Sequence, residues 1–141
     1  MTQLKIPSDI FDQMVAQAKA LAPIEACGIL AGKDGKVEKC YEMTNVDNSS
    51  VHFMMEPKEQ FAVVKDIRAS ALGMLAVYHS HPATGPRPSD EDIRLAFTPD
   101  VNYVIVSLQN PDEPEAKVYK ISGKTINEIE LEIVEGVEWT P

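Results

Sequence analysis

Apolar residues recur every three or four positions in two segments of the chain, a spacing that predicts helices with one buried face. The first helix is expected to begin at Pro7 and to end at Pro23. Its expected core face is Phe11, Met14, Val15, Ala18 and Leu21. The second is expected over about residues 57–72, with the core face Phe61, Val64, Ile67 and Ala71. A short third helix is expected over about residues 89–97.

The segments around these helices are short apolar or alternating runs, which are typical of strands. We expect strands at residues 3–6, 24–31, 36–44, 51–55, 74–78, 101–108, 116–121 and 126–134. Residues 32–35 have the composition of a hairpin turn between two of them. The chain has 141 residues and shows no linker or repeat, so we expect one domain over residues 1–141 with room for a proper core.

The composition narrows the classes of partner. The net charge of −9 and the sequence pI near 4.7 would repel the phosphates of nucleic acid or of an anionic membrane. The longest apolar stretches are far too short to cross a bilayer. Cys27 and Cys40 form neither a zinc knuckle nor a disulfide framework, and no signal peptide is visible. We therefore expect a cytoplasmic protein that binds neither nucleic acid nor membrane.

Two of the three histidines, His79 and His81, follow the apolar run at residues 74–78. Because side chains alternate along a strand, these two imidazoles are expected on one side, with Ser80 on the other. Ser89 and Asp92 follow after a proline-rich loop. Two imidazoles and the carboxylate of Asp92 would give zinc three ligands and leave a fourth position for water, as in catalytic zinc sites.

Each half of this pattern also has an ordinary structural interpretation. A His-x-His pair occurs on many strands that bind no metal. Ser89 followed by Asp92 three residues later is a capping box, which starts a helix. The two interpretations are compatible, because a helix that begins beside the histidines would hold the carboxylate of Asp92 toward a metal.

Taken together, these residues resemble the signature of the JAMM (MPN+) family of zinc metallo-isopeptidases, which are Mov34/MPN/PAD-1-like. The matching segments are His79-Ser80-His81-Pro82, Pro88-Ser89 with Asp92, and, far upstream, the Glu-x-x-Gly segment Glu25-Ala26-Cys27-Gly28. The resemblance runs from about Leu4 into the last strands. The chain carries no long insertion and is identified as a minimal prokaryotic-type member.

The resemblance implies a fold and an activity. The implied fold is mixed α/β, a curved central mixed β-sheet flanked by helices, as in MPN/JAMM and cytidine-deaminase-like folds. It implies one Zn²⁺ per chain at His79, His81 and Asp92. The implied reaction is hydrolysis of an amide bond at the C-terminal tail, Gly-Gly-like, of a ubiquitin-like or sulfur-carrier protein. The alternative is a non-catalytic MPN-type scaffold, although such relatives typically lack motif residues that are all present here.

Glu25 and Ser89 are the expected catalytic residues. Glu25 is an acid in an apolar segment, and its ordinary interpretation is a strand-edge residue that faces solvent. Beside a zinc site, a desolvated carboxylate with a raised pKa would suit a general base, which passes a proton from water to the departing amine. The Ser89 hydroxyl would stabilise the developing oxyanion. His52 and the two cysteines are expected to be structural.

Overall fold

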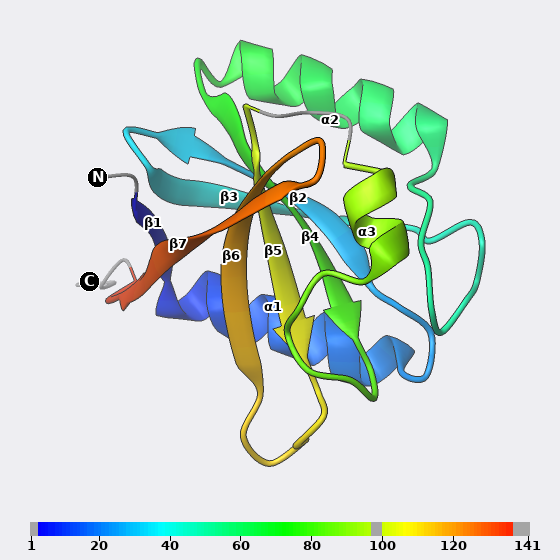
Figure 1. Cartoon of the computed structure of the whole chain (residues 1–141). Coiled ribbons are helices and arrows are strands. Elements are labelled where there is room, and N and C mark those ends of the chain that lie inside the picture. Colours follow the sequence, from blue (N-terminus) through cyan, green and yellow to red (C-terminus); the bar gives the residue numbers. More distant parts are fainter. Residues whose placement is uncertain (1–2, 97–99, 137–141) are drawn as a thin grey trace.

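The computed structural model describes residues 3–96 and 100–136 and shows strands and helices in mixed order (Figure 1). Its elements in chain order are β1 (Gln3–Pro7), α1 (Ser8–Leu21), β2 (Cys27–Lys33), β3 (Lys36–Met43), α2 (Pro57–Ala69), β4 (Gly73–His81), α3 (Asp90–Arg94), β5 (Asn102–Ser107), β6 (Glu115–Ser122) and β7 (Thr125–Val134). The predicted mixed α/β fold with a curved central sheet and flanking helices is therefore confirmed.

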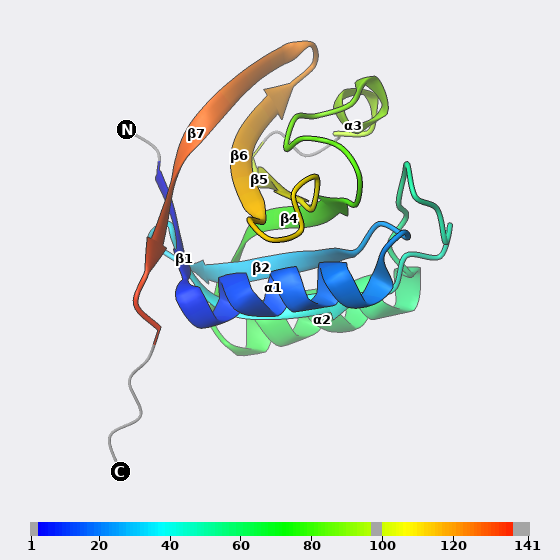
Figure 2. The ribbon, with the colours of Figure 1, turned by 90° about the horizontal axis from the view of Figure 1, so that it is seen from below.

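The sheet is mixed and closes on itself. Its strand order is β1-β3-β2-β4-β5-β6-β7, and β1 pairs in parallel with both β3 and β7. β4 and β5 are parallel neighbours, whereas the hairpins β2–β3, β5–β6 and β6–β7 are antiparallel. Figure 2 shows β6 and β7 curving away from β2 before β7 returns to β1. The curvature was expected, but the closure was not.

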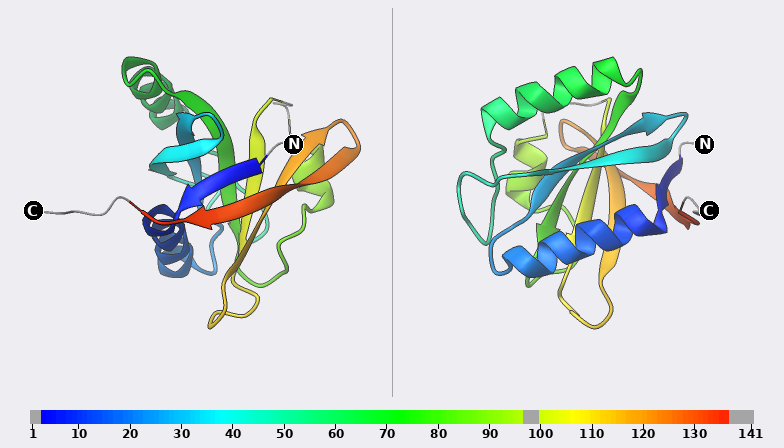
Figure 3. Two further views of the ribbon diagram at one scale, coloured as in Figure 1. Left: turned by 90° about the vertical axis from the view of Figure 1, so that its left-hand side faces the viewer. Right: turned by 180° about the vertical axis from the view of Figure 1, so that it is seen from behind.

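Helices α1 and α2 cover opposite faces of the part of the sheet that contains β2 and β3 (Figures 1 and 3). The alternation of side chains along β2 explains this arrangement. Leu30 packs in one core with Met14 of α1, whereas Ile29 packs in the other with Val63 and Ile67 of α2. Both faces of β2 are therefore buried, which agrees with its nearly continuous apolar sequence.

The predicted core faces of the helices are partly wrong. In α2 the buried residues are Val63 and Ile67, while Phe61 is 73% exposed and Val64 is 38% exposed. Val63 and Ile67 are one turn apart and face the sheet, whereas Phe61, two positions before Val63, points to the opposite side of the helix and remains in water. In α1, Met14 and Ala18 are buried as expected, but Leu21 in the last turn is 40% exposed.

Three predicted boundaries also differ from the structure. Residues 51–55 form no strand; their only ladder contact is an isolated bridge between Asn45 and Met55. β2 begins at Cys27, so Glu25 precedes the strand instead of lying within it. Helix α3 ends at Arg94, and Phe97 lies outside the described residues. Within the described ranges, no helix has both the length and the apolar character needed to span a membrane.

Candidate metal centre and active site

The end of β4 places both histidines on one face of the sheet. His79 is paired with Cys27 of β2 on one side and with Ile105 of β5 on the other, which fixes its position in the ladder. His79 and His81 are both buried. Ser80 lies between them and turns the other way, where its Oγ accepts a hydrogen bond from the N–H of Ala26 at 2.8 Å. The expected alternation of the three side chains is therefore present.

Asp92 joins the two histidines from the first turn of α3. Its Oδ2 lies 3.2 Å from Nε2 of His79 and 3.0 Å from Nε2 of His81, and the two Nε2 atoms are 3.1 Å apart. One ligand atom from each residue can be chosen so that all three lie within 4.8 Å of one another. Two imidazoles and a carboxylate at this spacing have the donor atoms that zinc accepts, so these side chains could hold a metal ion.

Neighbouring groups orient each imidazole. The Nδ1 of His81 lies 2.9 Å from the carbonyl oxygen of Gly85, so an N–H at Nδ1 leaves Nε2 as the free ligand atom. The loop that carries Gly85 is itself held by the hydroxyls of Ser107 and Tyr119. They donate to the carbonyl oxygens of Thr84 and Pro86 at 2.5 and 2.7 Å. The ring of His79 stacks on Phe53, with 4.7 Å between centroids.

The predicted capping box at the start of α3 is confirmed. The Oγ of Ser89 accepts from the N–H of Asp92 at 3.0 Å, and Oδ2 of Asp92 accepts from the N–H of Ser89 at 2.9 Å. Asp92 thus caps the helix and faces the histidines with the same oxygen. The hydrogen of the Ser89 hydroxyl is not used in the cap, because Oγ acts there as an acceptor.

His79, His81 and Asp92 are called the metal group below, because they could hold a metal ion, and their charges follow from these contacts. Burial raises the pKa of Asp92, but hydrogen bonds from His79, His81 and Ser89 outweigh this effect and hold the pKa far below its ordinary value. Burial lowers the pKa of His79. Burial also lowers that of His81, but its hydrogen bonds with Asp92 and Gly85 outweigh this effect and raise the pKa, so a metal would have to displace a proton there. An ionised carboxylate and a neutral imidazole are the forms that bind a metal.

Glu25 lies beside this group although it precedes β2. Since Ser80 donates its N–H to the carbonyl of Ala26 at 2.9 Å, the next position back along the chain, Glu25, comes level with His81. Glu25 is only 3% exposed, and its Oε1 has no hydrogen-bond partner within the described part of the chain. Burial is the main cause that raises its pKa to about 8; the charge of His81 opposes the rise, and that of Asp92 adds to it. A buried, unpaired carboxylate of this kind fits a nearby cation.

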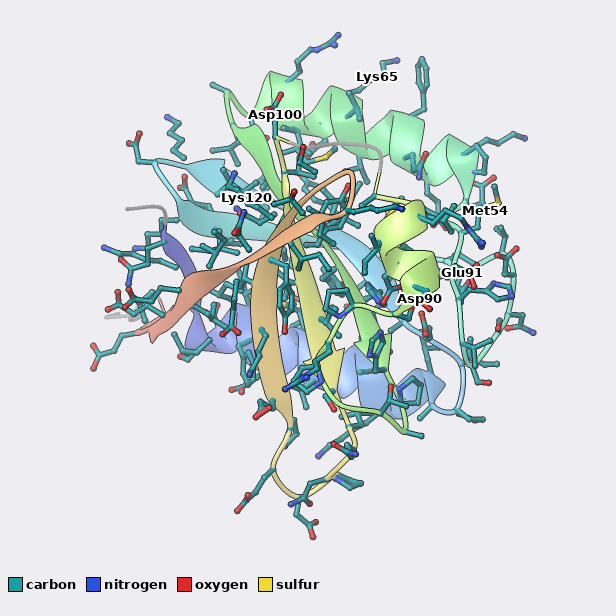
Figure 4. The ribbon with its side chains drawn as sticks, in the orientation of Figure 1. Met54, Lys65, Asp90, Glu91, Asp100 and Lys120 are labelled. Carbon is teal, nitrogen blue, oxygen red and sulfur yellow. The ribbon has the colours of Figure 1, made fainter. Side chains whose placement is uncertain are left out.

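A cavity of about 320 Å³ opens beside the metal group. His79 and Asp92 line it at one end, and its walls come from the segment before α2, from α3, from β5 and from the end of β6. The wall residues are His52, Phe53, Met54, Leu95, Tyr103, Ile105 and Ile121, with Asp47, Gln60, Pro88 and Glu91 completing the lining. Met54 and Glu91, which both line the cavity, are labelled in Figure 4 at the end of the molecule where α3 lies. The site can therefore take a largely apolar segment of chain.

The remaining candidates are not members of the group formed by His79, His81 and Asp92, although Cys27 is paired with His79 in the sheet. The Nδ1 of His52 is 3.0 Å from Oδ2 of Asp47, and both residues line the cavity. Cys27 is buried and Cys40 is half-buried, and burial raises the pKa of each thiol. Phe53 and the apolar cavity walls could not be recognised from the sequence, because such residues look like ordinary core positions.

The fold and the site together define a JAB/MPN-type domain. A solved JAMM structure, described as a metalloprotease-like zinc site in the proteasome and signalosome, superposes with a TM-score of 0.61 at 26% identity. The match covers 95% of this chain and all of that one. The chain belongs to the Prok-JAB family, the prokaryotic homologs of the JAB domain, whose model matches residues 7–121.

Relatives and a further structure agree with this assignment. The CysO-cysteine peptidase of Mycobacterium tuberculosis is 36% identical over 134 residues, covering 94% of this chain and 92% of that protein. The desampylase of Pyrococcus furiosus is 31% identical over 109 residues, covering 77% of this chain and 75% of that one. The solution structure of a protein from Desulfitobacterium hafniense has a TM-score of 0.88 at 42% identity, with 96% and 95% of the two chains covered.

Proposed function

We propose that this protein is a zinc-dependent peptidase of the JAMM type. The observation that carries the proposal is the convergence of the Nε2 atoms of His79 and His81 on one oxygen of Asp92, beside the buried, unpaired carboxylate of Glu25. Burial of a carboxylate costs free energy, and a scaffold that only binds a partner gains nothing that offsets this cost. Both relatives are named as enzymes, a CysO-cysteine peptidase and a desampylase, which supports a catalytic role.

In this proposal, His79, His81 and Asp92 hold one Zn²⁺. When bound, the ion would supply Lewis-acid chemistry, which activates water and polarises the amide carbonyl. Glu25 takes a proton from the attacking water as the new C–O bond forms. It gives that proton to the amine nitrogen as the C–N bond breaks. A pKa near 8 before metal binding suits a group that must both accept and release a proton.

Ser89 is proposed to stabilise the charge that develops on the carbonyl oxygen. Its Oγ already accepts the capping hydrogen bond from Asp92, so the hydroxyl hydrogen is left to donate. A neutral donor placed where negative charge develops favours the transition state over the ground state. Capping and catalysis therefore use different parts of the same hydroxyl.

The proposed substrate is the C-terminal tail of a ubiquitin-like or sulfur-carrier protein. The names of the two relatives support this class. In this chain the cavity supports it, because its mostly apolar walls lead to His79 and Asp92 and fit an extended tail better than a folded surface. We expect glycines next to the scissile bond, where the absence of a side chain lets the backbone come close to the ligands.

The experiment is a set of carrier-protein fusions that differ only in the last two residues before the cut. Each fusion is incubated with the zinc-loaded protein, and mass spectrometry follows the cleavage products over time. We expect cleavage after Gly-Gly and much slower cleavage after Leu-Leu. Equal rates would refute the preference for a thin tail. No cleavage of any fusion by the zinc-loaded protein would favour the non-catalytic scaffold.

A further inference from the structure

Asn45 uses every hydrogen-bonding position of its side-chain amide, although the sequence shows it only as part of a polar loop. Its Nδ2 donates to the backbone oxygens of Glu25 at 3.0 Å and of His52 at 3.1 Å. Its Oδ1 accepts from the N–H groups of Asp47 and Met54, both at 3.1 Å. The bond to Glu25 is buried and the other three are part-buried, so removal of the amide would leave the Glu25 carbonyl, above all, without a partner that water could readily replace.

The two donor bonds of Asn45 reach different parts of the site. One holds the backbone of Glu25, the proposed base. The other holds His52, which lines the cavity together with Phe53 and Met54. Phe53 in turn stacks on the metal-group residue His79. A single side chain therefore joins the base to the wall against which the substrate tail would lie.

The carboxylate of Glu25 depends on this backbone anchor. Its Oε1 has no hydrogen-bond partner among the described residues, so no side-chain contact at that oxygen fixes where it sits. The backbone is held at its carbonyl by Asn45 and at its N–H by the carbonyl of Ser49 at 2.8 Å. Loss of the carbonyl anchor would let the carboxylate move while the fold around it persists.

We propose that Asn45 is a positioning residue that sets Glu25 and the cavity wall at fixed places relative to the metal group. The inference rests on the proposed function of this site. The metal ligands lie on β4 and α3, and none of the four hydrogen bonds of the Asn45 amide goes to either element. Removal of the amide should therefore disturb proton transfer and tail binding without releasing zinc.

The first test compares Asn45→Asp with a control in the same loop. Aspartate has the shape of asparagine and keeps its acceptor oxygen. In place of the donor Nδ2, however, it puts a second oxygen against the backbone carbonyls of Glu25 and His52. The control is Asn48→Gly, because the Asn48 side chain is exposed and glycine accepts its backbone φ of 51°. We expect Asn45→Asp to keep its zinc, to lower kcat by about 10²-fold as misplaced catalytic groups do, and to raise KM. Asn48→Gly should match the wild type.

The second test is a double-mutant cycle with Glu25→Gln. If Asn45 acts on kcat through Glu25, the double variant should have nearly the same single-turnover rate as Glu25→Gln alone, because the base that Asn45 positions is already absent. The change Asn45→Asp should still weaken binding of the tail, because the cavity wall is affected in both backgrounds. Rate losses that add in full would overturn the proposal, as would an unchanged kcat or a loss of zinc in Asn45→Asp.

A third measurement does not require activity. Amide hydrogen exchange followed by NMR should be faster at Glu25 and Met54 in Asn45→Asp than in Asn48→Gly, with exchange along β4 unchanged. Equal exchange in the two variants would overturn the proposal for Asn45. A wild type that cleaved no fusion would refute only the proposed function, so the two failures can be told apart. If Asn45→Asp and Asn45→Ala both fail to fold, Asn45 is a residue of the fold, and the proposal is likewise overturned.

Discussion

The aromatic ring of Tyr78 lies against the Cα of Gly28, in space that the Cβ of any other residue would occupy. The two residues are paired across β2 and β4, and Tyr78 is buried. The Tyr78 hydroxyl donates to Oε1 of Gln17 at 2.5 Å, and Nε2 of Gln17 donates to the carbonyl of Cys27 at 3.0 Å. Gly28, the glycine of the Glu-x-x-Gly segment, therefore leaves the space that the buried ring of Tyr78 occupies beside the site.

Gly28→Ala should lower the free energy of unfolding by about 1–3 kcal/mol or more, because the added methyl group displaces a buried ring whose hydroxyl is already bonded. Urea denaturation of the purified proteins measures the effect. Gly73→Ala is the matched control: the nearest atom to its new Cβ is a backbone oxygen 3.9 Å away, so its midpoint should stay near that of the wild type. Equal midpoints for the two variants would contradict this reading of Gly28.

The metal assignment predicts that His79→Ala, His81→Ala and Asp92→Ala each lose most of the bound zinc, since each removes one of three protein ligands. Inductively coupled plasma mass spectrometry after dialysis gives the zinc content per chain. The third histidine provides the control. His52 is paired with Asp47 and stands outside the group of His79, His81 and Asp92, so His52→Ala should keep its zinc. Full zinc retention by His79→Ala and His81→Ala would remove the proposed site.

The assignment of the base predicts that Glu25→Gln keeps zinc and fold but loses hydrolysis by about 10²–10⁴-fold, because glutamine has nearly the same shape and cannot accept the proton. Cleavage of a Gly-Gly fusion and the zinc content are measured on the same preparation. An active Glu25→Gln protein with zinc bound would show that another group transfers the proton.

The same variant should be more stable than the wild type when both lack metal. Burial raises the Glu25 pKa to about 8 from 4.5, so the folded state binds the proton more tightly than the unfolded chain does. This stabilisation is complete below about pH 4.5 and is lost as the pH rises through 8. Thermal unfolding in a chelator should therefore show the gain from Glu25→Gln growing from pH 5 to pH 9, on the order of a few kcal/mol. A stability difference between Glu25→Gln and the wild type that stayed constant with pH would contradict the raised pKa of Glu25.

Both thiols should be slow to react in the native protein. Burial raises the pKa of Cys27 to about 12 and that of Cys40 to about 11, and a thiol reacts through its thiolate. Iodoacetamide at pH 8 should modify neither residue in the time that modifies both in urea, as followed by mass spectrometry. Hydrolysis should survive the treatment. Rapid alkylation that abolished hydrolysis would indicate that a cysteine thiol takes part in the reaction.

The metal group could be predicted from the sequence because it is local. His79, His81 and Asp92 lie within one strand end, one short loop and one capped helix start, and each of these has a sequence pattern. Glu25 is far away in sequence, and its segment was placed from the family signature. Asn45 could not be found in this way, because its importance comes from four backbone partners that only the folded chain brings to it.

The errors in the fold have a similar origin. Apolar periodicity indicates that α2 has a buried face, but the sheet decides that Val63 is buried and that Phe61 is not. Residues 51–55 have the composition of a strand, yet backbone groups of His52 and Met54 are bound by the side chain of Asn45 instead of a neighbouring strand. Closure of the sheet joins residue pairs such as Gln3 and Glu130, and no local pattern encodes a contact at that separation.

That closure has a consequence for biosynthesis. A ribosome makes the chain from its N-terminal side, so β1 emerges before its longer partner β7, which is complete only once residues 125–134 have been made. Until then one edge of β1 has no strand to pair with, and an uncovered edge can pair with another chain. His79, His81 and Asp92 therefore leave the ribosome before β7 does, and β1 gains its second neighbour only after all three have been made.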